Sequence, residues 1–217
     1  MKKYDLGTEK IGRLIRHFSL PCVISMLVAA LYNIVDQIFI GWSEAGAAGN
    51  AATNIVYPFT VLALGLSLLV GDGAAANFSL ELGSKKKERA DKSIGNGFFI
   101  LVILSVFLCA VALVFKSQIL RLFGANPREK VCYNFALQYF TVICIGFPFY
   151  MIGQGMNASI RSDGSPKYAM ACTLVGAVAN LILDPLFIFV FKMGVKGAAI
   201  ATVIGQALTF IMSIAYL

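Results

Sequence analysis

Long apolar runs constrain the fold of this 217-residue chain more than any other feature. Several runs of mostly apolar residues follow one another, each of the roughly 20 residues that an α-helix needs to cross the hydrocarbon core of a bilayer. Charged residues make up 13% of the chain and apolar residues 59%, whereas soluble domains average about 25% and about 45–50%. The sequence therefore predicts an all-α integral membrane protein.

Polar segments divide the chain into a lead-in and six predicted spans. Residues 1–17 are basic and amphipathic, so we expect them to lie at the membrane surface. Residues 18–217 are expected to form one bundle of six transmembrane helices. Residues 116–130, between the third and fourth spans, predict a short surface helix followed by an Asn-Pro turn. The six spans cover about 18–41, 53–80, 95–115, 131–158, 168–191 and 194–217.

Lysine and arginine counts predict the orientation of the bundle. The N-terminal segment and the loops after the second and fourth spans together carry twelve of these residues, and the opposite side carries six. Cytoplasmic loops of membrane proteins are enriched in Lys and Arg, so we expect a cytoplasmic N-terminus. The net charge of +7 arises from these loops. No basic patch with interleaved aromatic residues occurs, and no nucleic-acid partner is expected.

Sequence motifs for enzymatic chemistry are absent from the chain. It contains no HExxH, GxSxG or P-loop pattern, and its five cysteines form no CxxC pair. His17 is the only histidine, which argues against a histidine-based metal site or catalytic triad within the chain. We therefore expect neither an enzyme nor a cofactor.

Acidic residues inside the predicted spans are the main functional candidates, since an ionised carboxylate at the centre of a membrane helix costs roughly 2.5–3.5 kcal/mol on insertion scales. Asp36 and Asp184 both lie roughly 8–10 Å below the outer ends of the first and fifth spans, at a rise of about 1.5 Å per residue. Thr202 in the sixth span lies at a similar level. Asn180 shares a helix face with Asp184, and Asn33 shares one with Asp36. We expect these five residues to meet in one polar layer.

Such a layer has suitable chemistry for a coupling ion. Two carboxylates in a poorly solvated site resist joint ionisation, which favours proton binding, and the same oxygens could instead bind a sodium ion. The structural alternatives are a helix–helix hydrogen bond for Asp36 and a bend before Pro185 for Asp184. No other metal is expected. Asp72 lies near the cytoplasmic end of the second span, where a local cap or gate contact is the expected role.

Further polar or aromatic residues inside the spans are candidates for lining a substrate cavity. Most such residues in membrane helices serve interhelical packing, and that alternative applies to each of these. The candidates are Tyr32, Tyr139, Gln154 and Asn157.

An ordered set of short motifs resembles the N-terminal half of a transporter of the multidrug and toxic compound extrusion (MATE) family. Each motif is weak alone, but the ordered set is specific and covers nearly all of the chain. The matching segments are SLPCVISMLVAALYNIVDQIFIG, LELGSKKKERA, LRLFGAN, RSDGSPKYAM, NLILDPLFIF and GAAIATVIGQ.

The resemblance implies one six-helix lobe of a two-lobed, twelve-helix antiporter. Such transporters export bulky, often cationic, amphipathic compounds in exchange for protons or sodium ions. The resemblance also implies functional acids in the first and fifth spans, which here are Asp36 and Asp184, with Asn180 and Thr202 matching their polar neighbours. Because the chain ends at Leu217 with no second bundle, we expect a fragment that does not transport alone.

The expected partners are membrane lipid, small amphipathic substrates and the missing C-terminal lobe. The expected location is the plasma membrane, meaning the cytoplasmic membrane of a bacterium or archaeon. Two other functions stay open. A flippase for lipid-linked saccharide precursors would favour a basic cavity, whereas the deep polar positions here are acidic or neutral. A non-transporting membrane scaffold or assembly subunit would use the acids only for structure.

Overall fold

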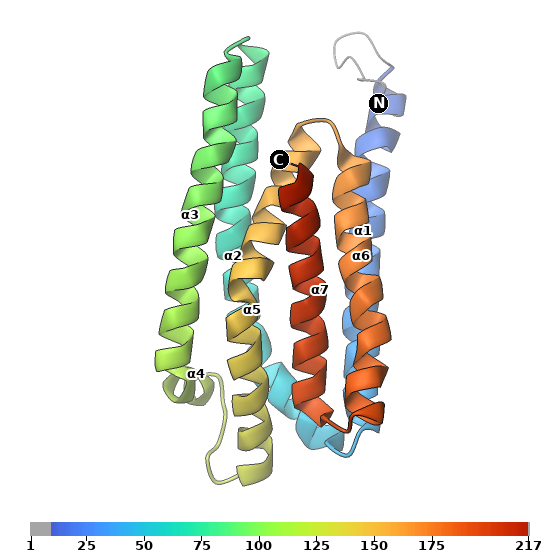
Figure 1. The fold of residues 1–217 in the computed structure, drawn as a ribbon, viewed down its shortest axis with the longest axis vertical. Helices are drawn as coiled ribbons and strands as arrows, with labels where there is room; N and C mark the ends of the chain where they lie inside the picture. The colour runs from blue at the N-terminus through green and yellow to red at the C-terminus, as the bar shows by residue number, and fades with distance from the viewer. Residues whose placement is uncertain (1–9, 217) are drawn as a thin grey trace.

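The computed structural model describes residues 10–216 as a bundle of α-helices. Within this range, six helices are long and apolar enough to cross a membrane, which confirms the predicted fold class. They are α1 (Ile11–Trp42), α2 (Gly46–Gly83), α3 (Lys87–Val114), α5 (Lys130–Ser162), α6 (Pro166–Pro185) and α7 (Gly194–Tyr216). α6 continues into one π-helical turn, η1 (Leu186–Val190), and the short helix α4 (Lys116–Leu122) lies at one end of the bundle (Figure 1).

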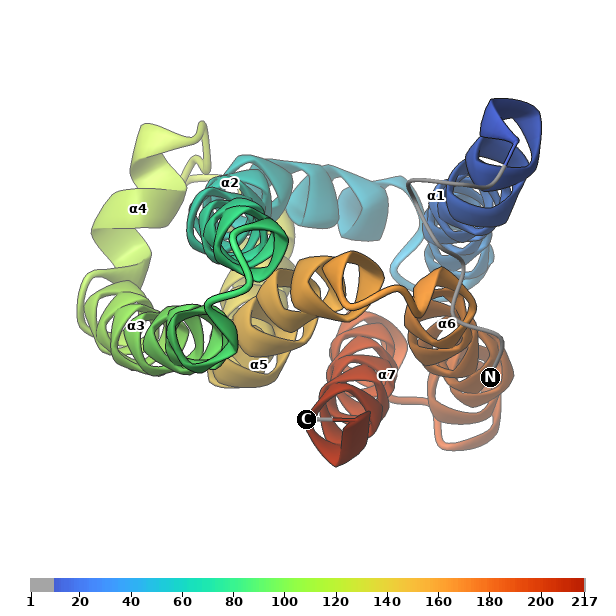
Figure 2. The ribbon, with the colours of Figure 1, turned by 90° about the horizontal axis from the view of Figure 1, so that it is seen from above.

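Several helices extend beyond the apolar runs from which the spans were predicted. Residues 11–17 of the predicted lead-in belong to α1 without a break, and residues 1–9 lie outside the described part of the chain. α2 has 38 residues, which corresponds to a length of about 57 Å. This exceeds the roughly 30 Å of a hydrocarbon core. Figures 1 and 2 show α2 changing direction along its length, and Pro58 lies inside it, where a proline favours a bend.

The helices run up and down, so both ends of the described chain lie at the same end of the bundle (Figure 1). We call this the N-terminal end and the other, which holds α4, the opposite end. α5 is central and packs against α2, α3 and α7, whereas α1 packs mainly against α6 (Figure 2). Helices from the start and the end of the chain therefore lie side by side.

Two pairs of glycines allow neighbouring helices to approach closely. A methyl group on Gly71 would lie 2.5 Å from backbone atoms of Gly155, so α2 and α5 touch through their main chains. A methyl group on Gly205 would lie 2.7 Å from the carbonyl oxygen of Gly176, between α7 and α6. Small residues at contacts between membrane helices permit close van der Waals packing, because lipid offers no hydrophobic driving force for association.

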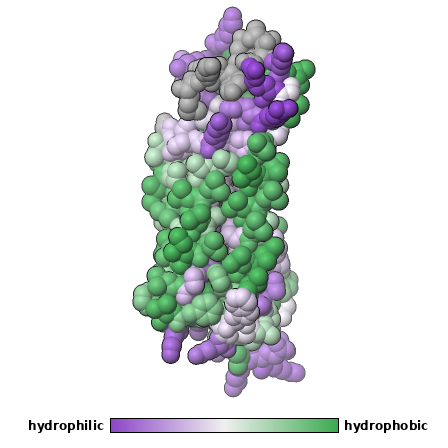
Figure 3. Space-filling view, turned by 90° about the vertical axis from the view of Figure 1, so that its right-hand side faces the viewer, coloured by the Kyte–Doolittle hydropathy of each residue, from purple (hydrophilic) through white to green (hydrophobic). Residues whose placement is uncertain are grey.

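Large apolar side chains cover the outside of the bundle. On the face drawn in Figure 3 they form a broad, mostly apolar band between two polar ends. On α1 alone, Met26 is 72% exposed and Leu31 59%. Soluble monomers rarely expose contiguous apolar patches of more than a few hundred Å². The band is therefore the lipid-facing surface of a multi-pass membrane protein.

Candidate functional site

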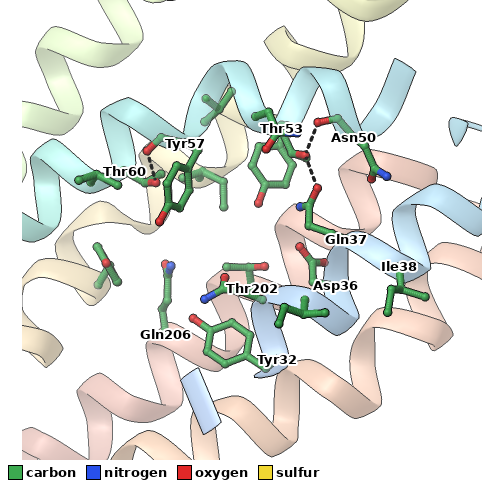
Figure 4. A pocket seen from close by; sticks show the side chains of 18 of the residues that line it. Tyr32, Asp36, Gln37, Ile38, Asn50, Thr53, Tyr57, Thr60, Thr202 and Gln206 are labelled. Atoms are coloured by element: carbon green, nitrogen blue, oxygen red, sulfur yellow. Dashed lines mark hydrogen bonds between the residues drawn. The ribbon is translucent and has the colours of Figure 1, made fainter. Parts of the chain in front are cut away.

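A cavity of about 810 Å³ lies among α1, α2, α5 and α7 (Figure 4). Pockets for small organic molecules occupy about 300–1,000 Å³, so its size suits such a ligand. Its wall combines aromatic rings, amides, hydroxyls and one carboxylate, and none of the residues found to line it is a lysine or an arginine. The polar and aromatic lining residues are Tyr32, Asn33, Asp36, Gln37, Trp42, Asn50, Thr53, Asn54, Tyr57, Thr60, Tyr139, Phe147, Tyr150, Thr202 and Gln206.

Asp36 provides the carboxylate of this cavity wall. It lies six residues before the end of α1, and its side chain is buried. Asp184 on α6 is completely buried, and its carboxyl group lies close enough to the carboxyl group of Asp36 for the two to interact. Because α1 packs against α6, two acids far apart in the sequence meet beside the cavity.

Asn180 and Thr202 complete the group of residues that we call the polar layer, which consists of Asp36, Asn180, Asp184 and Thr202. Asn180 Nδ2 donates to Asp184 Oδ1 at 3.1 Å and to Thr202 Oγ1 at 3.4 Å. Thr202 Oγ1 donates to the carbonyl oxygen of Ala198 at 3.0 Å. The amide of Asn180 therefore links α6 to α7 and orients one oxygen of Asp184.

Three buried oxygen atoms of the polar layer have no hydrogen-bond partner among the described residues. They are Asp36 Oδ1, Asn180 Oδ1 and Asp184 Oδ2. A buried acceptor without a donor destabilises a fold by about 1–3 kcal/mol, more if it is charged. A proton shared by the two carboxyl groups would satisfy part of this need, and hard cations bind carboxylate and amide oxygens. The residues present therefore fit either a proton or a small hard cation such as sodium.

The chain leaves regular α-helical geometry directly after Asp184. Pro185 ends α6, and the next five residues form the π-helical turn η1. Single π-helical turns occur frequently at functional sites. The ring of Phe189 in η1 contacts Phe39 of α1, with centroids 6.1 Å apart. The irregular segment beside Asp184 is therefore packed against the helix that carries Asp36.

The residues predicted to line a substrate cavity lie in three different places. Tyr32 and Tyr139 line the large cavity. Gln154 lines a second, smaller cavity among α1, α5, α6 and α7. Asn157 lines neither, because its Nδ2 donates to the carbonyl oxygen of Ala169 at 2.9 Å and its Oδ1 accepts from Arg161 at 2.8 Å. Asn157 thus joins α5 to α6 as a packing residue.

Asn33, which was predicted to accompany Asp36, lies at the edge of the group. It lines the large cavity, but its Nδ2 donates to the carbonyl oxygen of Ala29 at 2.7 Å and its side chain is exposed. The neighbouring Gln37 also lines the large cavity. Gln37 Oε1 accepts from Thr53 Oγ1 at 3.0 Å, which links α1 to α2 (Figure 4).

Several cavity residues were missing from the sequence prediction. Asn50, Thr53, Tyr57 and Thr60 line one face of α2 at spacings of three and four residues. This periodic polar stripe was a usable signal, but the predicted span began at 53 and left Asn50 in a loop. Gln206 was detectable in the same way, since it follows Thr202 by one helical turn.

Asp72 lies away from the cavity, near the N-terminal end of the bundle. Its Oδ1 is 3.9 Å from Arg161 Nη2, and its side chain is 61% exposed. An exposed ion pair of this length contributes little to stability. The contact is local, between α2 and α5.

The lipid-facing band, the six spans and the partly open polar cavity define a multi-pass helical membrane protein with room for a small organic ligand. The chain belongs to the MatE family, whose family model matches residues 21–186. The resemblance to MATE transporters found in the sequence is thereby confirmed.

Two curated relatives match almost the whole chain. It is 29% identical over 213 residues to the multidrug export protein MepA of Staphylococcus aureus, a match that covers 98% of this chain and 46% of MepA. It is 28% identical over 204 residues to the FAD transporter of Shewanella oneidensis, which covers 92% of this chain and 44% of the relative. The chain thus spans about half the length of these relatives.

A solved transporter structure shares the fold. The MATE multidrug transporter DinF-BH superposes with a TM-score of 0.91 at 38% identity. The match covers 100% of this chain and 48% of DinF-BH. The bundle therefore corresponds to about half of a MATE transporter.

Proposed function

We propose that this bundle is one lobe of an antiporter that exports amphipathic cationic compounds in exchange for protons or sodium ions. The observation that carries the proposal is the buried Asp36–Asp184 pair beside a cavity of about 810 Å³. Among the described residues, no lysine or arginine was found to line this cavity. A transporter of this kind needs one group that responds both to the driving cation and to the substrate. Asp36 can respond to the substrate because it lines the cavity, and to the driving cation because it adjoins Asp184.

Coupling follows from competition for the negative charge of Asp36. While its carboxylate is free, it attracts a cationic substrate into the cavity. A proton or a sodium ion held between Asp36 and Asp184 neutralises that charge and lowers the affinity for the substrate. Because binding free energies are linked reciprocally, a bound substrate lowers the affinity for the cation by the same factor.

The polar layer keeps the cation beside the cavity wall. Asn180 holds one oxygen of Asp184 and can offer its own Oδ1 to the cation, while Thr202 is held by the Ala198 carbonyl oxygen. The aromatic rings of Tyr32, Tyr57 and Tyr150 line the space where the substrate would lie. Aromatic faces attract organic cations through cation–π contacts of about 0.5–2 kcal/mol.

The remainder of the transporter is proposed as a second six-helix lobe. The chain spans 44–48% of the transporters compared with it, which supports this assignment. In transporters built from two repeats, substrate moves when one repeat rocks against the other around the binding site. The chain would therefore supply a binding site but need its partner lobe for transport.

The excess of lysine and arginine at the N-terminal end supports a cytoplasmic N-terminus in a cell membrane. Lys85, Lys86 and Lys87 follow the end of α2 there, and Arg161 and Lys167 flank the turn between α5 and α6. Asp36 then lies in the outer half of the membrane, where an inward gradient of protons or sodium would load it.

The cavity chemistry favours cations over anions. The Shewanella relative is named an FAD transporter, and FAD carries two phosphate groups that proteins usually bind with arginine or lysine. A lipid-linked saccharide precursor also carries phosphate groups. The large cavity of this chain presents a carboxylate and neutral amides, with no cationic side chain found in its lining. A scaffold function would leave the unsatisfied oxygens of the polar layer without a role.

Replacing one acid tests the proposal directly. In proteoliposomes of the complete transporter, we expect Asp36→Asn to reduce gradient-driven efflux of a cationic dye by at least about tenfold, which corresponds to about 1.4 kcal/mol in the barrier. The exposed Asp91 on α3 provides the matched control, and Asp91→Asn should transport at the wild-type rate. Separate pH and sodium gradients identify the driving ion. Unchanged efflux by Asp36→Asn would reject the coupling role.

A further inference from the structure

A second cavity of about 50 Å³, which we call the small chamber, lies beside the polar layer among α1, α5, α6 and α7. It shares Thr202 and Gln206 with the large cavity. Asn180 lines only the small chamber, whereas Asp36 lines only the large cavity. The polar layer therefore adjoins two cavities, one large and one small.

The small chamber accommodates water or a small cation but excludes an organic substrate. A single water molecule needs about 10–15 Å³ of such space, so the chamber has room for a few. Its wall provides polar partners from Gln154, Thr173 and Thr209. Two buried oxygens of lining residues, Asn180 Oδ1 and Gln206 Oε1, have no hydrogen-bond partner among the described residues. Both are acceptors, which water or a small cation satisfies.

Two glycines pack closely against polar residues of the chamber wall. A methyl group on Gly176 would collide with Thr209 Oγ1, and one on Gly146 would lie 2.9 Å from Gln206 Oε1. Thr209 Oγ1 is held by the carbonyl oxygens of Cys172 at 3.2 Å and Gly205 at 3.1 Å. The hydroxyl thus stays between α6 and α7 at the chamber wall.

A polar stripe on α7 continues from the chamber toward the N-terminal end. Thr202, Gln206, Thr209, Ser213 and Tyr216 recur at alternating spacings of four and three residues, which places them on one helix face. Ser213 is completely buried, so the stripe runs inside the lobe and not along lipid. α6 packs against α7, and it contacts this stripe through hydrogen bonds to Thr202 and Thr209.

The stripe ends at an acidic residue on the N-terminal end of the bundle. The hydroxyl of Tyr216 donates to Asp163 Oδ2 and lies within hydrogen-bonding distance of Ser165 Oγ, each at 2.7 Å. Asp163 is exposed in the turn between α5 and α6. It places a carboxylate at this end of the stripe, in a turn that Arg161 and Lys167 flank.

We propose that the driving cation travels between the polar layer and the N-terminal end through the small chamber and along the α6–α7 interface. This inference rests on the proposed cation coupling and adds a route to it. The organic substrate uses the large cavity, and the cation uses a separate path inside the lobe. Substrate and cation then compete for Asp36 without having to pass one another.

The test measures exchange rate and substrate affinity separately in proteoliposomes of the complete transporter. Thr209→Val and Gln154→Leu remove polar atoms that line only the small chamber. We expect each to slow cation-driven exchange about tenfold, which corresponds to about 1.4 kcal/mol in the barrier, under whichever of the pH or sodium gradients drives the wild type. The dissociation constant of the substrate should stay within about twofold of the wild-type value.

Two further variants make the result specific. Thr209→Ser keeps the hydroxyl and should restore the rate. Thr141→Val on α5 removes a hydroxyl that donates to Leu137 and lines neither cavity, so it should exchange at the wild-type rate. Wild-type rates for Thr209→Val and Gln154→Leu, or failure of Thr209→Ser to restore exchange, would overturn the route. Efflux that survives Asp36→Asn would instead overturn the coupling site itself.

Discussion

At the scale of single residues, two buried asparagines show that the same type of side chain can have different roles in a membrane bundle. Both ends of the Asn157 amide are occupied, by the Ala169 carbonyl oxygen and by Arg161. Asn180 uses its nitrogen in two hydrogen bonds and leaves its buried oxygen free. An amide whose nitrogen and oxygen are both hydrogen-bonded to neighbouring residues holds helices together. An amide whose oxygen has no hydrogen-bond partner can still bind a cation or a water molecule.

This difference gives a prediction for Asn157. Replacing it with alanine should lower the free energy of unfolding by about 1 kcal/mol, because interhelical hydrogen bonds in membrane proteins contribute about 0.6 kcal/mol on average and up to about 1.7. Thermal unfolding of the purified chain in detergent measures the change. Asn77→Ala provides the control, since the Asn77 side chain is exposed and donates only to Ser93. Reduced substrate affinity at unchanged stability would contradict the assignment of Asn157 to packing.

The same residues explain how far the sequence could predict the site. Depth along a helix follows from the rise per residue, so counting from span ends brought together Asp36, Asp184 and Thr202. Depth does not give the direction of a side chain around the helix axis. Gln154 and Asn157 therefore looked equivalent, although they face different neighbours. Apolar runs also set the predicted span limits, which excluded Asn50 from the cavity.

At the scale of elements, main-chain contact determines how closely the helices pack. Gly71 and Gly155 bring α2 against α5, and the neighbouring Ser67 Oγ donates to the Met151 carbonyl oxygen at 2.6 Å. The six long helices and the short helix α4 were predictable from the lengths of the apolar runs and from the Lys/Arg-rich loops between them. Which helices touch was not, because apolar runs look alike on all sides and carry little information on neighbours.

A glycine pair on one helix tests the importance of this contact. We expect Gly71→Ala to destabilise the bundle by about 1–3 kcal/mol, because its methyl group would meet the Gly155 main chain and overpacking has costs in this range. Gly73→Ala is the matched control, since nothing lies within 4 Å of its added carbon. Thermal unfolding in detergent compares the two. Equal melting temperatures for both variants would show that α2 and α5 can move apart without lowering the stability of the bundle.

At the scale of the whole molecule, the bundle contains a partly open cavity but only about half the length of a transporter. α1, α2, α5 and α7 all contribute residues to the wall of this cavity within the lobe. The chain should therefore bind without transporting, since alternating access requires movement against a second lobe.

The fluorescence of Trp42, the only tryptophan of the chain, can measure substrate binding. Trp42 lines the large cavity and is 75% exposed. In nanodiscs, a cationic aromatic dye should quench its fluorescence at saturable concentrations, whereas a matched anionic dye should not. Proteoliposomes that contain only this chain should show no gradient-driven accumulation of the cationic dye. Concentrative transport by the chain alone would contradict the need for a second lobe.

The packing of α1 against α6 also affects how the protein is made. α1 leaves the ribosome first, but α6 begins more than a hundred residues later. At about 5–20 residues per second, Asp36 waits roughly 7–30 s in the membrane before Asn180 and Asp184 emerge. Throughout that interval its carboxylate lacks its final neighbours, and a neutral, protonated form is the less costly one in lipid. The polar layer is therefore completed only when α6 and then α7, which carries Thr202, have been inserted, and Asp36 must first pass through synthesis without these neighbours.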